Sequence, residues 1–117
     1  MKNTISLKLN GDFRRLYSKG KKAAGAYVAV YMSRNRLGIN RLGLTASTSL
    51  GHAVVRNRVK RLMRAAYTNV EERIGCGYDF VLVGRTRAIK AHEEQVEKDL
   101  RYSLHKLGLL EGDKKEE

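Results

Sequence analysis

Several features that would place the chain in a common class of protein are missing from its 117 residues. There is one cysteine, Cys76, and no proline. A lone cysteine excludes an intramolecular disulfide and suits a reducing compartment, so we expect a cytoplasmic protein with Cys76 as a small buried side chain. No uncharged stretch reaches the roughly 20 residues that cross a bilayer. Because the sequence contains no stretch with the composition of a linker, we expect one domain over residues 1–110 and a charged, disordered tail over 111–117.

Acidic residues are missing from half of the chain. Residues 13–70 contain thirteen Lys or Arg and no Asp or Glu, and residues 71–117 contain eleven acidic against nine basic residues. The formal net charge is +12 and the sequence pI is about 10.1. A basic half of this kind predicts a polyanionic partner. Nucleic acid is the leading candidate and an anionic membrane surface is the competitor.

The stretch VVRNRVKRLMRAAY, at residues 54–67, predicts a basic amphipathic helix over about 53–71. On a helical wheel, one arc of about 100° holds the apolar positions, which are Val59, Leu62, Met63, Ala66 and Val70. The other side holds Arg56, Asn57, Lys60, Arg61 and Arg64. Like charges at i, i+4 cost roughly 0.2–0.5 kcal/mol per pair, which a bound polyanion would offset. A solvent face with salt bridges, a helix-turn-helix recognition helix and a membrane-surface helix are the alternatives.

The remaining pattern predicts a small mixed sheet packed by helices. Residues 10–20 read as a helix with Asn10 as its N-cap, and 91–107 as the last helix. Residues 26–32 and 41–47 read as two antiparallel strands, with a short extra strand near 22–25 as an option. Residues 78–84 are apolar on both faces, which indicates a buried central strand. The predicted fold is an α/β sandwich of the α+β kind, in the order α-β-β-(β)-α-β-α.

Aromatic residues gather before the basic helix. Phe13 and Tyr17 are spaced i, i+4 on the first helix, and Tyr27 and Tyr31 would share one face of the next strand. Such residues are often part of a core. Beside a basic helix they are also typical of a platform on which unpaired RNA bases stack. Both interpretations stay open.

Catalytic signatures are missing as well. His52, His92 and His105 are scattered, and the sequence has no metal-ligand spacing, phosphate-binding glycine loop or nucleophile motif. Asp79 lies in an otherwise apolar strand, where we expect it to cap or pair. We therefore predict no catalytic residue, no metal site and no small-molecule substrate for this chain.

The run LGLTASTSLGHAVVRNRVKRLMRAAY, Leu42 to Tyr67, resembles the protein subunits of bacterial ribonuclease P. The RNR triplet, the following KR and the next Arg stand at the family spacing. The resemblance extends from DFRRLYSKG and AYVAVY through YDFVLVGR to the last helix. Thr48 and Ser49 stand where many members have basic residues, so no cation is carried over from that loop.

The resemblance implies a left-handed crossover through the basic helix, a catalytic RNA as partner, and removal of the 5′ leader from precursor tRNA. It places Arg56, Asn57, Arg58, Lys60, Arg61 and Arg64 on the catalytic RNA. It places Phe13, Tyr17 and Tyr31 on the single-stranded leader. The Mg²⁺ ions of the reaction would be held mainly by the RNA, and no membrane would be involved. From the residues alone, a non-enzymatic nucleic-acid-binding module (a ribosomal protein or a DNA-binding regulator) stays open.

Overall fold

The computed structural model describes residues 3–110, which form three helices and five strands. The strands are β1 (Thr4–Ser6), β2 (Lys21–Ala24), β3 (Val28–Arg34), β4 (Asn40–Thr45) and β5 (Tyr78–Gly84). The helices are α1 (Asn10–Lys19), α2 (Ala53–Val70) and α3 (Glu93–Lys106), with short 3-10 turns η1 (Thr48–Leu50), η2 (Glu71–Arg73) and η3 (Thr86–Lys90). The predicted fold class is confirmed, and the optional strand is present as β2.

The five strands form one mixed sheet in the order β1-β4-β5-β3-β2. The central strand β5 pairs with β3 in antiparallel and with β4 in parallel orientation. Strands β3 and β4 therefore run antiparallel, as predicted, but β5 lies between them. Phe80, Val81 and Leu82 are apolar on both faces of β5 and almost fully buried, which favours the centre of the sheet for this strand. The β4–α2–β5 connection joins two parallel neighbours, as the resemblance implied.

Strand β1 was not predicted. It pairs in parallel with β4 at the edge of the sheet, and its one large apolar side chain, Ile5, is half exposed. The strand is held instead by polar contacts with the end of α2. The hydroxyl of Thr4 donates to Glu71 over 2.6 Å and lies 2.8 Å from the hydroxyl of Tyr67. Hydrophobic periodicity, the main signal for a strand, does not detect contacts of this kind.

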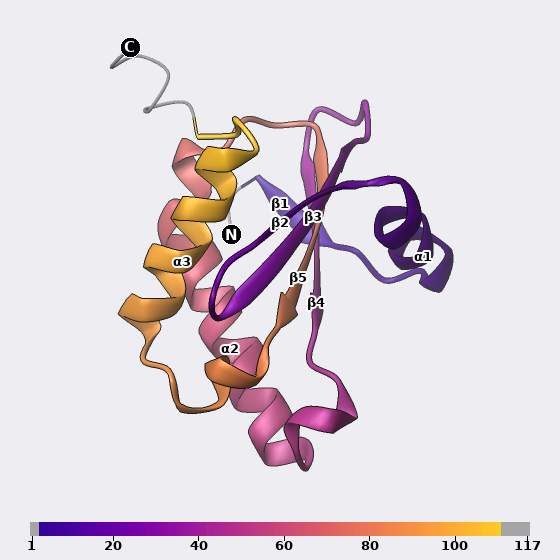
Figure 1. The fold of residues 1–117 in the computed structure, drawn as a ribbon. Coiled ribbons are helices and arrows are strands. Elements are labelled where there is room, and N and C mark those ends of the chain that lie inside the picture. The colour runs from indigo at the N-terminus through magenta and orange to yellow at the C-terminus, as the bar shows by residue number, and fades with distance from the viewer. Residues whose placement is uncertain (1–2, 111–117) are drawn as a thin grey trace.

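The sheet separates two unequal cores (Figure 1). Helices α2 and α3 cover one face and enclose the main core, while α1 covers the other face over a small cluster around Leu16 and Val81. Helix α2 buries its predicted apolar stripe except Leu62, which is only partly buried, and it also buries Tyr67. Most of the helix's apolar face is thus used inside the fold, while Val54 in its first turn is exposed.

Two local predictions were wrong. The N-cap of α1 is Leu9, and Asn10 is the first helical residue, with no side-chain hydrogen bond capping the helix. Cys76 is exposed, because it lies in the loop between the end of η2 and β5 rather than in an element with a core face.

Candidate nucleic-acid interface

The basic surface of α2 consists of the six polar side chains predicted to meet RNA. Asn57, Arg61 and Arg64 are exposed, and Arg56, Arg58 and Lys60 are partly buried. Among residues 3–110, the ion pairs involve none of the five cations in this set. The interpretation of α2 as a solvent face with salt bridges therefore fails, and its positive charge remains available to a partner.

Arg58 differs from the rest of this set. Its guanidinium donates to the carbonyl oxygens of Ile89 and Ala91, the latter over 2.9 Å. These two bonds tie α2 to the turn η3 and to Ala91, the residue that directly follows this turn. Arg58 thus has a structural function in this chain, whatever else it contacts.

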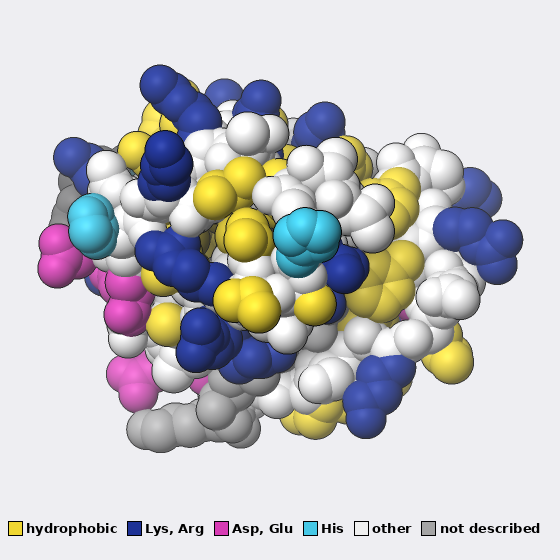
Figure 2. Space-filling model, turned by 90° about the horizontal axis from the view of Figure 1, so that it is seen from below, with side chains coloured by type: hydrophobic (Ala, Val, Ile, Leu, Met, Phe, Trp, Pro, Cys, Tyr) yellow, Lys and Arg dark blue, Asp and Glu magenta, His cyan; other side chains and the backbone are white. Residues whose placement is uncertain are grey.

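The two charge types are segregated on the surface as they are in the sequence. Figure 2 shows Lys and Arg side chains spread across the face seen from below, between hydrophobic and uncharged groups, while Asp and Glu gather at the side where α3 lies. On α3, Arg101 pairs with Glu97 over 3.2 Å. The acidic residues of α3 also accept bonds from Asn69, whose amide donates to Glu93 and Glu97.

An aromatic groove lies on the opposite face of the sheet, between α1 and the strands. The rings of Tyr17 and Tyr31 meet edge to face with centroids 5.0 Å apart, and Phe13 lies 6.5 Å from Tyr17. The structure therefore brings together the three predicted leader-binding residues. Tyr17 is the most accessible of them, at 41% exposed, and its hydroxyl lies 2.9 Å from the hydroxyl of Thr45.

Close contact with the sheet fixes the floor of the groove. Phe13 lies directly against Gly43 of β4, where a Cβ atom would meet its ring at 2.5 Å. Only glycine leaves room for the ring at this position. Next to the rings a cavity of about 590 Å³ opens, lined by Asn10, Phe13, Arg14, Tyr17 and Thr45.

Two cations beside the groove were not predicted from the sequence. Arg14 lines its cavity, and the ammonium of Lys22 lies 5.4 Å above the ring of Tyr31, within range of a cation–π contact. The pairing of β2 with β3 sets Lys22 opposite Tyr31, so a prediction of that register would have found it. Tyr27 was misplaced: it precedes β3 and packs against the main core on the other face of the sheet.

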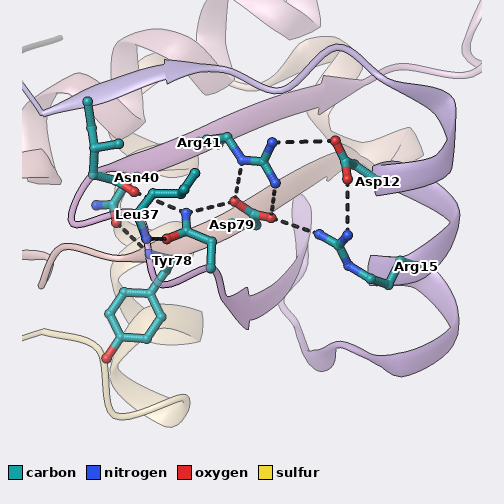
Figure 3. A network of polar contacts seen from close by, with 9 residues as sticks. Asp12, Arg15, Leu37, Asn40, Arg41, Tyr78 and Asp79 are labelled. Carbon is teal, nitrogen blue, oxygen red and sulfur yellow. Dashed lines mark hydrogen bonds and ion pairs between the residues drawn. The ribbon is translucent and has the colours of Figure 1, made fainter.

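A buried ionic network anchors α1 beside the groove (Figure 3). Asp79 on β5 is completely buried and accepts two bonds from Arg41, at 2.8 and 2.6 Å, and one from Arg15 at 2.9 Å. Asp12 then bridges the two guanidinium groups. Burial by itself would raise the pKa of Asp79, but hydrogen bonds from Arg41 and Asn35 and the nearby positive charges hold it below its usual value. The prediction that Asp79 pairs is confirmed.

Neither a metal centre nor a membrane span is found in the part of the chain that the structure describes. Residues 3–110 contain no cluster of three or more His, Cys, Asp or Glu side chains able to hold a metal ion. Within the same residues, no helix has the length and apolar character needed to cross a bilayer. His92 is the N-cap of α3, where its backbone N–H bonds the side chain of Gln95.

Comparison with known proteins agrees with this geometry. A family model described as Ribonuclease P matches residues 1–108. The ribonuclease P protein component of Alkaliphilus metalliredigens is 36% identical over 110 residues, covering 94% of this chain and 99% of the relative. That of Clostridioides difficile is 36% identical over 99 residues, covering 84% and 87%.

Solved structures show the same fold. The Staphylococcus aureus RNase P protein superposes with a TM-score of 0.80 at 30% identity, covering 90% of this chain and 96% of that one. The Thermotoga maritima RNase P protein gives a TM-score of 0.74 at 26% identity, with coverage of 91% and 94%. Sequence and fold thus agree over nearly the whole length of the chain, which belongs to the family of ribonuclease P protein components.

Proposed function

We propose that this chain is the protein subunit of a ribonuclease P ribonucleoprotein that removes the 5′ leader from precursor tRNA. The observation that carries the proposal is the row of cations on α2, which has no acidic partner among residues 3–110, on a helix whose apolar face is mostly used in the core. A membrane-surface helix needs that apolar face for the lipid. A phosphate backbone needs only the cations, so α2 suits a large RNA.

The aromatic groove is proposed to hold the single-stranded leader of the substrate. Stacking on aromatic rings tolerates any base sequence, because every base has a π face. Phe13, Tyr17 and Tyr31 supply three adjacent rings, whose centroids lie 6.5 Å apart for Phe13 and Tyr17 and 5.0 Å apart for Tyr17 and Tyr31. Arg14 and Lys22 add positive charge at the edges of the groove for the backbone of the strand.

The chemistry is proposed to reside in the RNA, together with Mg²⁺ ions held mainly by its phosphates. The donor set of the residues that the structure describes does not fit such ions. The carboxylates nearest the groove, Asp12 and Asp79, already bind the guanidinium groups of Arg15 and Arg41. The protein would position the substrate and reduce the repulsion between two polyanions.

Salt dependence of assembly with the cognate catalytic RNA tests the proposal. If α2 neutralises about five phosphates, log K should fall with log salt at a slope of roughly −4, at about 0.7–0.9 per contact. Reversing the charge of Arg61 or Arg64 should weaken assembly and flatten the slope, measured by filter binding from low to moderate salt. Both side chains are exposed, so the fold should be retained.

Lys106→Glu serves as the matched control, because Lys106 is exposed on α3 and contacts the ring of Tyr102. It should leave the slope nearly unchanged. Arg58 is unsuitable for this test because its loss would also release η3. A slope near zero for the unmodified protein would exclude α2 as a docking surface.

A further inference from the structure

A second pocket lies on the α2–α3 side of the sheet, away from the aromatic groove. Its volume is about 420 Å³, and it is lined by Tyr27, Thr86, Arg87, Ile89, Lys90, Ala91 and Gln95. Tyr27 and Ile89 are partly buried and pack against the main core, so the apolar part of the pocket is built on a rigid base. None of the predicted RNA-binding residues lines this pocket.

The rim of the pocket is positively charged. Arg87 and Lys90 are exposed, and within residues 3–110 neither forms an ion pair or a side-chain hydrogen bond. Of the residues that the structure describes, no acidic one lines the pocket. The nearest acid along the chain, Glu93, accepts a bond from Asn69 and faces other cavities beside α2. An anion at this rim would meet no carboxylate among the lining residues.

The polar groups of the pocket are held in place. The amide of Gln95 donates to the hydroxyl of Tyr27 over 3.2 Å, and its oxygen accepts the backbone N–H of His92 over 2.9 Å. Arg58 binds the carbonyl oxygens of Ile89 and Ala91 from the other side. The pocket is therefore coupled rigidly to α2 through Arg58.

We propose that this pocket receives one unpaired nucleotide of the catalytic RNA that docks on α2. Its base would lie against Tyr27 and Ile89, and its flanking phosphates near Arg87 and Lys90. Aromatic and aliphatic surface with adjacent cations is the chemistry that binds an unstacked nucleotide. The pocket is attached to α2 and lies across the sheet from Tyr17, which favours the catalytic RNA over the leader as the source. This inference rests on the proposed function.

The first test removes the rim charges. Arg87→Ala combined with Lys90→Ala should make the salt slope of assembly shallower by about 1.5 and weaken binding about 30-fold at 0.1 M salt, the loss expected for two phosphate contacts. Lys98→Ala combined with Lys106→Ala removes the same charge from the exposed side of α3 and should change the slope little. Circular dichroism should show both double variants folded.

The second test locates the nucleotide. With p-benzoylphenylalanine at position 87, ultraviolet light should crosslink the reconstituted holoenzyme to a single-stranded position of the catalytic RNA. The same probe at position 102, an exposed site on α3, should not react at that nucleotide. A crosslink from position 87 to the precursor leader, or to no RNA, would overturn the proposal.

The two proposals fail in different ways. If the unmodified protein keeps a steep salt slope and the Arg87/Lys90 variant behaves like its control, the pocket has no part in RNA binding while α2 retains its own. If the unmodified protein shows no salt slope at all, the docking of RNA on α2 is excluded as well.

Discussion

At the scale of single residues, Tyr17 offers the cleanest test of the aromatic groove. Phe13 and Tyr31 also support the small core, whereas Tyr17 is 41% exposed. If Tyr17 stacks a leader base, Tyr17→Ala should cost the holoenzyme about 1–3 kcal/mol in precursor tRNA binding. Binding of mature tRNA, which has no leader, should barely change. Equilibrium binding of both tRNAs to the variant holoenzyme measures the difference.

Tyr17→Phe is the matched control for this experiment. It keeps the ring and removes only the contact with the hydroxyl of Thr45, so precursor affinity should stay near that of the unmodified protein. Equal losses for precursor and mature tRNA in the Tyr17→Ala variant would show that Tyr17 acts through the fold and not on the leader.

A candidate functional residue is easier to predict from the sequence when its own side chain indicates what it can bind. It is harder to predict when its function depends on a contact with a residue far away in the sequence. The other cations of α2 and the rings of α1 were named from their spacing, whereas Arg58 was named only through the family resemblance. Lys22 was missed because its position over Tyr31 depends on the register of two strands. The clamp formed by Arg58 was missed because its acceptors are backbone carbonyls 31 and 33 residues away. Backbone acceptors leave no mark on side-chain composition.

At the scale of elements, helices and the central strand follow from periodicity, whereas sheet edges do not. The bounds of β5 match the predicted range, because a short continuous apolar run is typical of a fully buried strand. The place of β5 between β3 and β4 could not be read from local pattern, because strand order is decided by burial of the whole sheet. Strand β1 depends on Glu71 and Tyr67, which lie at the end of α2.

The contact between α1 and the sheet depends on Asp79, which predicts a specific response to acid. A lowered pKa in the folded state contributes stability that is present above the unfolded value of about 3.9 and is lost as the pH falls through the folded value. Asp79→Asn should therefore lower the free energy of unfolding at pH 7 by about 2 kcal/mol. This value is smaller than the cost of breaking a fully buried ion pair, because Arg15 is half exposed and solvent screens its charge. The same substitution should also reduce the further loss of unfolding free energy between pH 5 and pH 3. Urea unfolding at the three pH values measures both effects.

Glu94→Gln is the control for that titration, because Glu94 is exposed on α3. Its unfolding free energy should follow the acid dependence of the unmodified protein. If Asp79→Asn keeps the full acid dependence, the network does not hold Asp79 in its charged form. Other contacts would then have to hold α1 against the sheet.

At the scale of the whole molecule, the sheet separates two surfaces with different chemistry. Helix α2 presents cations on the side of the main core, and α1 presents aromatic rings on the other side. With a net charge of +12, the protein can approach two polyanions at once. One sheet between the two surfaces fixes their relative position, which the proposed role in positioning the substrate needs.

The last prediction concerns where phosphodiester cleavage takes place. Hydrolysis of this kind calls for clustered carboxylates holding metal ions or for a positioned acid–base pair. The one completely buried carboxylate of the described residues, Asp79, is engaged by two arginines. Purified protein should therefore leave precursor tRNA intact across the whole Mg²⁺ range. Adding the catalytic RNA should give accurate cleavage, at lower salt than the RNA needs alone, because the protein's cations screen the repulsion between RNA and substrate. Gel analysis of the 5′ products measures both. Site-specific cleavage by RNA-free protein, abolished by His52→Ala, would move the chemistry into this chain.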